Sequence, residues 1–223
     1  VWASVERDAG KVTEELFEEA QRRDPEKKRP WVMLVDGHQD QLKHIWANIK
    51  HFGVEVILIL DFIHVLEYLW KAAYCFYPAG SEQAEAWVAE RALLILKGNA
   101  STVAGAIRRS ATLRGLSANE REAVDACAGY LLNYKDMLKY DEYLAAGLPI
   151  ATGVIEGACR HLVNDRMAIT GARWGLQRAE AILKLRSLKS SGDSEAYWDF
   201  YKDQALKRNH ASQYESFPLQ EAA

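Results

Sequence analysis

Two short runs of apolar residues, each closed by an aspartate, constrain most strongly what this chain can fold into. The first run is Trp31–Val35, followed by Asp36, and the second is Val54–Leu60, followed by Asp61. The second run is rich in Val and Ile and almost wholly apolar, which is typical of a buried parallel strand. Because parallel strands end at the same edge of a sheet, we expect both aspartates at one edge, where open α/β folds place their sites.

Helical patterns surround the two runs. Apolar residues recur at helical spacing before the first run and between the two runs, which predicts helices over residues 10–23 and 39–52. Gly53 is a typical residue to end the second of these helices. The order of helix, strand, helix and strand is a crossover pattern, so the fold class that we expect is α/β.

The residues after Asp61 show only helical patterns up to about Ala146, which predicts a helical insertion without any strand. A further helix carries Glu156, and two more follow it. The molecule should therefore be α/β but mostly helical. We expect a partial α/β core over residues 1–61, the insertion over 62–146, the Glu156 helix and C-terminal helices over 147–208, and a tail over 209–223.

Composition limits the partners that the chain can have. Its 223 residues carry a formal net charge of -3, so any surface that binds DNA must be local. The three cysteines are odd in number and widely spaced, which predicts reduced thiols rather than a disulfide framework or a zinc site. No apolar run reaches the length of a transmembrane helix, so we expect no membrane partner.

Three acidic residues are candidates for catalysis. Asp36 and Asp61 close the two strands, and Glu156 follows on a helix after a long helical stretch. Clustered carboxylates repel one another, so they are expected mainly around a hard divalent cation that takes oxygen ligands. This pattern predicts metal-assisted phosphoryl chemistry, with His64 supporting the site from one helical turn after Asp61.

Each acid also has a purely structural interpretation. Asp36 precedes Gly37, and Asp-Gly is a common turn dipeptide. Asp61 could cap a helix that packs His64, and Glu156 could be a first-turn acid that interacts favourably with the helix dipole.

A locally basic segment follows Glu156. Six basic residues against three acidic ones lie between Glu156 and Arg186, a surplus of 6 − 3 = +3. An arginine there can bind a phosphate, and an indole can stack on a base. The alternative is a solvated helix face with a core tryptophan. The candidate DNA-binding residues are Arg160, Arg166, Arg173, Trp174 and Arg178.

Three motifs resemble one family. "LVDGHQDQL", "LDFIHVLEYLWKAA" and above all "LPIATGVIEGACRHLVNDRMAITGARWGL" are similar to those of bacterial insertion-sequence transposases of the ISKra group. That group belongs to the DDE transposases with an RNase H-like fold and is similar to the Mutator-like enzymes. The resemblance covers about Val1 to Tyr201.

The resemblance implies roles for named residues. Asp36 corresponds to the second catalytic acid at the end of strand four, and Glu156 corresponds to the third acid after a helical insertion. Asp61 and His64 resemble the Cys-or-Asp-x-x-His signature that Mutator-like enzymes carry beyond the second Asp, although Asp61 remains an alternative second acid. Asp36 and Glu156 would bind Mg²⁺ or Mn²⁺ in a two-metal mechanism.

The first catalytic aspartate of the family has no match here. Only Asp8 and Asp24 precede Asp36, and neither ends an apolar strand. The chain also lacks an initiator Met, so we expect an N-terminally truncated transposase that is inactive by itself. The complete enzyme would cleave transposon ends and transfer strands into target DNA. It would bind terminal inverted repeats, act as a homo-oligomer, and be cytoplasmic and associated with the nucleoid.

Two other functions stay open at this point. The chain could be a non-catalytic remnant that binds DNA or transposase subunits. It could instead be a small α/β ligand-binding module, which would have an apolar pocket and no basic surface beside Glu156.

Overall fold

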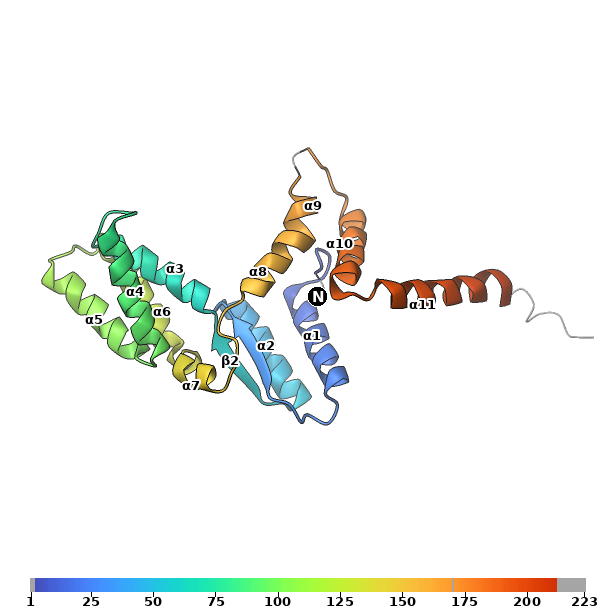
Figure 1. Cartoon of the computed structure of the whole chain (residues 1–223), viewed down its shortest axis with the longest axis horizontal. Helices are drawn as coiled ribbons and strands as arrows, with labels where there is room; N and C mark the ends of the chain where they lie inside the picture. The colour runs from blue at the N-terminus through green and yellow to red at the C-terminus, as the bar shows by residue number, and fades with distance from the viewer. Residues whose placement is uncertain (1–2, 170, 212–223) are drawn as a thin grey trace, which may run out of the picture. The chain divides into compact units, whose positions relative to one another are not determined.

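The computed structural model describes residues 3–169 and 171–211, apart from the side chains of residues 154–156 and 210–211. The chain divides into two compact units (Figure 1). The first unit is Ala9–Val154, and the second combines Val1–Asp8 with Ile155–Ala223. Most of the tail expected over residues 209–223 lies outside the described part.

The first unit begins with the crossover that the sequence predicts. Its elements are α1 (Ala9–Arg23), β1 (Trp31–Val35), α2 (Gln39–Phe52) and β2 (Val56–Leu60). The two strands form a parallel sheet in which Trp31 pairs with Val56 and Val35 pairs with Leu60. α1 packs against α2, where the Phe17 and Phe52 rings stack with centroids 5.7 Å apart. The expected α/β crossover is confirmed, as a two-stranded sheet.

Residues 62–146 are all described, and they contain helices and no strand, as expected. α6 (Glu122–Asn133) packs against both α3 (Phe62–Ala73) and α5 (Ala100–Leu113). Small buried side chains such as Ala72, Ala104 and Ala128 lie in the core of this group. The burial of the Cys127 thiol in α6 raises its pKa to about 12. The elements are α3 (Phe62–Ala73), α4 (Glu82–Leu96), α5 (Ala100–Leu113), α6 (Glu122–Asn133), η1 (Lys135–Met137) and α7 (Tyr140–Ala145).

Within its described residues, the second unit contains helices joined by irregular segments and no strand. Leu162 and Leu183 form its small buried core. The N-terminal segment of this unit is fixed to α10 (Leu176–Ser191), because the buried Glu180 carboxylate accepts hydrogen bonds from the Val5 amide and the Ser4 hydroxyl, both at 3.0 Å. The elements are α8 (Gly153–Cys159), which begins at the end of the first unit, η2 (Arg160–Asn164), α9 (Asp165–Met167), α10 (Leu176–Ser191), α11 (Ser194–Leu206) and η3 (Lys207–Ala211).

No helix within residues 3–169 and 171–211 is long and apolar enough to cross a membrane. The cysteines in this part of the chain, Cys75, Cys127 and Cys159, are free thiols.

Candidate functional site

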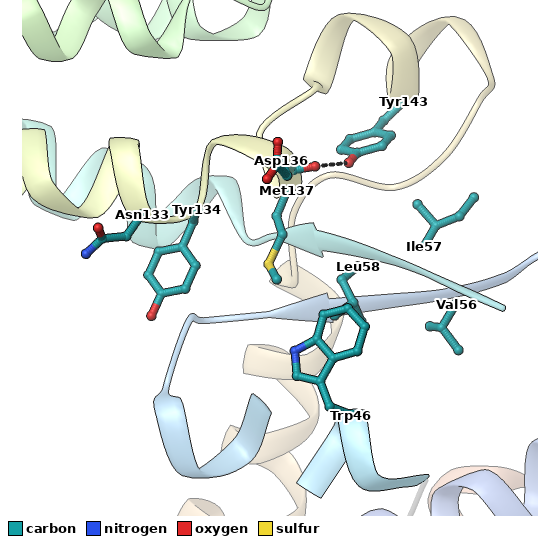
Figure 2. A pocket seen from close by; sticks show the side chains of 9 residues that line it. All are labelled: Trp46, Val56, Ile57, Leu58, Asn133, Tyr134, Asp136, Met137 and Tyr143. Atoms are coloured by element: carbon teal, nitrogen blue, oxygen red, sulfur yellow. Dashed lines mark hydrogen bonds between the residues drawn. The ribbon is translucent and has the colours of Figure 1, made fainter. Parts of the chain in front are cut away.

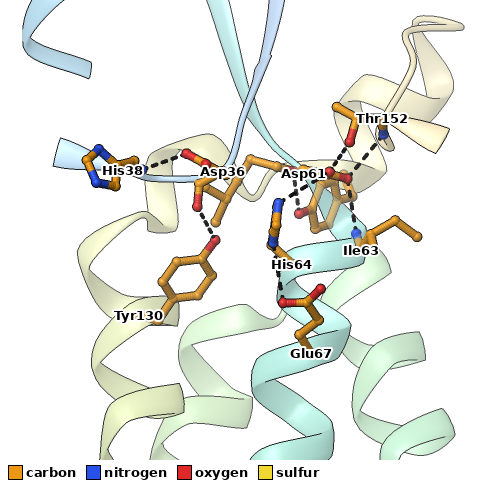
Figure 3. Close-up of polar contacts among 10 residues, drawn as sticks. Asp36, His38, Asp61, Ile63, His64, Glu67, Tyr130 and Thr152 are labelled. Carbon is orange, nitrogen blue, oxygen red and sulfur yellow. Dashed lines mark hydrogen bonds and ion pairs between the residues drawn. The ribbon is translucent and has the colours of Figure 1, made fainter. Parts of the chain in front are cut away.

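Asp36 and Asp61 directly follow the last paired residues of β1 and β2. Val35 and Leu60 are partners in the parallel ladder, and the Asp61 amide donates to the Val35 carbonyl at 2.8 Å. The backbones of the two aspartates therefore lie at the same edge of the sheet, as expected for parallel strands (Figure 3). Their side chains, however, have different surroundings.

The Asp61 carboxylate is buried, with 2% of the residue exposed. One oxygen accepts hydrogen bonds from the Ile63 amide at 3.1 Å and the Thr152 amide at 3.2 Å, and the other accepts from the Thr152 hydroxyl. Asp61 thus caps α3 and binds the residue that precedes α8. Both of its oxygens bind protein donors, and the burial of the residue separates the carboxylate from solvent.

The Asp36 carboxylate is exposed. Its Oδ1 accepts a hydrogen bond from the His38 amide at 2.7 Å, which is the local turn that an Asp-Gly pair favours. Among the described residues, no side chain donates to its Oδ2 or forms an ion pair with it. An exposed carboxylate with one open oxygen is a suitable ligand for Mg²⁺ or Mn²⁺.

His64 lies beside Asp61 and is shared with a second acid. Its Nε2 is 4.0 Å from Asp61 Oδ2, and its Nδ1 is 3.4 Å from Glu67 Oε2. The first distance is too long for a hydrogen bond. His64 is half-exposed at the start of α3, with a carboxylate on each side of its ring (Figure 3).

Two tyrosines from α6 and its C-terminal end complete this edge of the sheet. The Tyr130 hydroxyl donates to the Asp36 carbonyl at 2.8 Å, and the Tyr134 hydroxyl donates to the Gly37 carbonyl at 2.6 Å. Burial raises the pKa of the Tyr130 hydroxyl, and the nearby Tyr68 and Asp36 raise it further, so it stays a donor. Neither tyrosine was predicted from the sequence, where the available signal was their spacing of four, which places them on one helical face.

Glu156 lies in α8, but its side chain is outside the described part of the chain. The prediction that Asp36 and Glu156 share a metal therefore stays a prediction. Within the described residues, no three His, Cys, Asp or Glu side chains converge in a way that could hold a metal ion.

The arginines of the second unit differ in their surroundings. Arg160, Arg173 and Arg178 are exposed. Arg166 lies over the Trp174 ring, with its guanidinium carbon 4.9 Å from the ring centroid, so one face of this indole is covered. Arg186 has a structural role, because it donates to the Leu162 carbonyl at 2.9 Å and to the His161 carbonyl in the π-helical turn η2.

A cleft of about 370 Å³ lies beside β2 in the first unit (Figure 2). Trp46, which is 52% exposed, lines it together with Ile57 of the strand and Met137 of η1. Tyr143 lies at the same cleft and donates to the Asp136 carbonyl at 3.2 Å. The lining is mainly apolar, as the ligand-binding alternative requires.

Comparison with protein-family models, with curated proteins and with solved structures found no match.

Proposed function

We propose that this chain is part of a DDE transposase with an RNase H-like catalytic core, an enzyme that cleaves transposon ends and joins them to target DNA. The observation that carries the proposal is the exposed Asp36 carboxylate, which follows a parallel strand and keeps one oxygen open. The three motifs that resemble the ISKra group support the same assignment. Asp36 and Glu156 are the two acids that this chain contributes.

The environment of Asp61 favours Asp36 as the second catalytic acid. A hydrated cation must reach its ligand from solvent, whereas the Asp61 carboxylate is buried and accepts hydrogen bonds at both oxygens. Asp61 has another role in this proposal: through Thr152 it fixes the residue that precedes α8, the helix that carries Glu156.

Asp36 and Glu156 would hold Mg²⁺ or Mn²⁺, which when bound activates water or a DNA hydroxyl and stabilises negative charge on the phosphate. The His38 amide contributes by holding one oxygen of Asp36 at 2.7 Å, which limits the directions that the open oxygen can take. His64 remains a neighbour of the site and not a ligand, since hard cations prefer oxygen.

The exposed arginines of the second unit would bind the DNA backbone. Arg160, Arg173 and Arg178 have open guanidinium groups for phosphates, while Arg166 reaches solvent from the face of Trp174. Such contacts position DNA without reading its sequence.

The metal assignment can be tested by NMR with Mn²⁺, whose unpaired electrons broaden the signals of nearby amides. We expect Mn²⁺ to broaden the His38 amide signal of the chain, because this amide binds the Asp36 carboxylate. Asp36→Asn should remove the broadening. Asp40→Asn is the matched control, since Asp40 is an exposed acid on α2 that pairs with Lys43 at 2.8 Å. Broadening that survives in Asp36→Asn would overturn the proposal for Asp36.

The cleft beside β2 supports a second candidate function, the binding of a small apolar ligand. A fluorescent apolar probe would then bind the chain, and Trp46→Ala would weaken this binding because Trp46 lines the cleft. Probe binding that does not depend on Trp46 would remove this candidate.

A further inference from the structure

Two tyrosines bind successive carbonyls of the turn that carries Asp36. The Tyr130 hydroxyl donates to the Asp36 carbonyl at 2.8 Å, and the Tyr134 hydroxyl donates to the Gly37 carbonyl at 2.6 Å. These two carbonyls belong to the peptide groups on either side of Gly37. The N–H of the second peptide group is the His38 amide, which binds the Asp36 carboxylate at 2.7 Å. Tyr134 therefore binds the same peptide group whose N–H binds the carboxylate.

The tyrosine rings also enclose Gly37. This glycine is buried and has a φ of +88°, a conformation that favours glycine. A Cβ at this position would lie 3.1 Å from a Tyr134 ring carbon and 3.2 Å from a Tyr130 ring carbon. The turn is thus restrained by ring contacts in addition to the two hydrogen bonds.

Other side chains fix the two tyrosines in turn. The Tyr68 ring of α3 stacks on the Tyr130 ring with centroids 4.0 Å apart and an angle of 14° between the planes. The Gln39 side-chain amide donates to the Tyr134 hydroxyl from the start of α2. Tyr130 is only 8% exposed. Tyr130 is therefore part of the packed interior of the first unit, and the half-buried Tyr134 packs against the same core.

We infer that Tyr130 and Tyr134 are positioning residues of the candidate metal site, which hold the Gly37–His38 peptide so that it orients the Asp36 carboxylate. The helical segment over residues 62–146 then contributes to the site through α6 and the residue at its C-terminal end. The inference rests on the proposed function only where it assigns metal binding to Asp36.

The first test uses the metal-free chain and follows the exchange of the His38 amide hydrogen with water by NMR. Tyr130→Phe with Tyr134→Phe removes both hydroxyls and keeps both rings, so we expect the fold to persist and the exchange rate to rise about tenfold. Asp36→Ala gives the exchange rate of the His38 amide without its hydrogen bond to the carboxylate. Tyr143→Phe is the matched control, because it removes a hydroxyl that binds the Asp136 carbonyl instead. A His38 rate in the double variant equal to the wild-type rate would overturn the inference.

The second test adds Mn²⁺ and separates this inference from the proposed function. We expect the double variant to need about ten times more Mn²⁺ for the same broadening of His38, while Tyr143→Phe behaves as wild type. If the wild type and the double variant need the same Mn²⁺ concentration for the same broadening, a positioning role at a metal site is contradicted. Broadening that persists in Asp36→Asn would contradict the proposed function instead, and the metal-free exchange rates would still decide whether the tyrosines orient the carboxylate.

Discussion

The Asp61 carboxylate, at the end of β2, binds Thr152, the residue that precedes α8. Thr152 donates its amide to one carboxylate oxygen at 3.2 Å and its hydroxyl to the other. Residues 91 positions apart are thereby connected by a buried acid. This contact gives Asp61 a structural role and leaves Asp36 as the exposed acid at the edge of the sheet.

Replacing Asp61 should destabilise the first unit. Asp61→Ala removes the cap of α3 and leaves the Ile63 and Thr152 amides without their acceptor. We expect a loss of about 1–3 kcal/mol in the free energy of unfolding, and a smaller loss of about 0.5–1.5 kcal/mol for Thr152→Val. Urea denaturation followed at the amide signals of β2 measures both. Asp40→Ala, at an exposed position, serves as the control, and an Asp61→Ala variant as stable as this control would contradict the role assigned to Asp61.

Gly37→Ala should destabilise the chain more than a comparable change at Gly115. Both glycines have positive φ, +88° and +69°, so both substitutions strain the backbone. Only the new methyl group at position 37 would contact tyrosine rings, since a Cβ at Gly115 meets no atom within 4 Å. We expect an additional loss of about 1–3 kcal/mol at Gly37, the cost of overpacking. Thermal or urea unfolding measures both variants. Equal losses in the free energy of unfolding for Gly37→Ala and Gly115→Ala would show that the ring contacts do not restrain the turn.

Removing one exposed arginine of the second unit should weaken DNA binding for every sequence alike. Arg173→Ala removes one phosphate contact, so the slope of log affinity against log salt should fall by about 1. Fluorescence anisotropy with two unrelated duplexes at several salt concentrations measures this slope. Arg109→Ala, an exposed arginine of α5 in the first unit, is the matched control. An effect on one duplex only would argue for base recognition by Arg173.

Glu180 should make the stability of the second unit depend on pH. The Val5 amide, and then the Ser4 hydroxyl and Lys184, hold the pKa of this carboxyl below its usual range. Its contribution is therefore full above the pKa of the unfolded chain and is lost as the pH falls through the lower folded pKa. We expect Glu180→Gln to lose about 1 kcal/mol near neutral pH and to match the wild type in strong acid. Unfolding followed at the amide signals of α10 over a range of pH measures this loss, and the exposed Glu195→Gln serves as the control. A difference in the free energy of unfolding between Glu180→Gln and the wild type that stays constant with pH would contradict the role of Glu180.

The sequence predicts the crossover and the helical segment well because both depend on local patterns. The run Trp31–Val35 coincides with β1, whereas β2 begins at Val56 and not at Val54. The difference arises at the end of α2, where Gly53 adopts φ 57° and the Lys27 ammonium binds the Phe52 and Gly53 carbonyls. The residues before Val56 therefore belong to the turn.

The surroundings of the acids could not be predicted in the same way. The sequence left open whether Asp61 is a helix cap or a catalytic acid, and the decisive partner, Thr152, is 91 residues away. Tyr130 and Tyr134 bind carbonyls 94 and 97 residues before them. Main-chain carbonyls are present at every residue, so no residue type at positions 36 and 37 indicates which side chain will bind them.

The central claim is that Asp36 and Glu156 bind the same divalent cation, and the most direct test is to follow Mn²⁺ broadening of the His38 amide in Glu156→Gln. If the two acids share a cation, removing the charge of Glu156 should weaken the broadening at His38 as Asp36→Asn does, while Asp40→Asn leaves it unchanged. Broadening at His38 that is the same in Glu156→Gln and in the wild type would contradict the shared site.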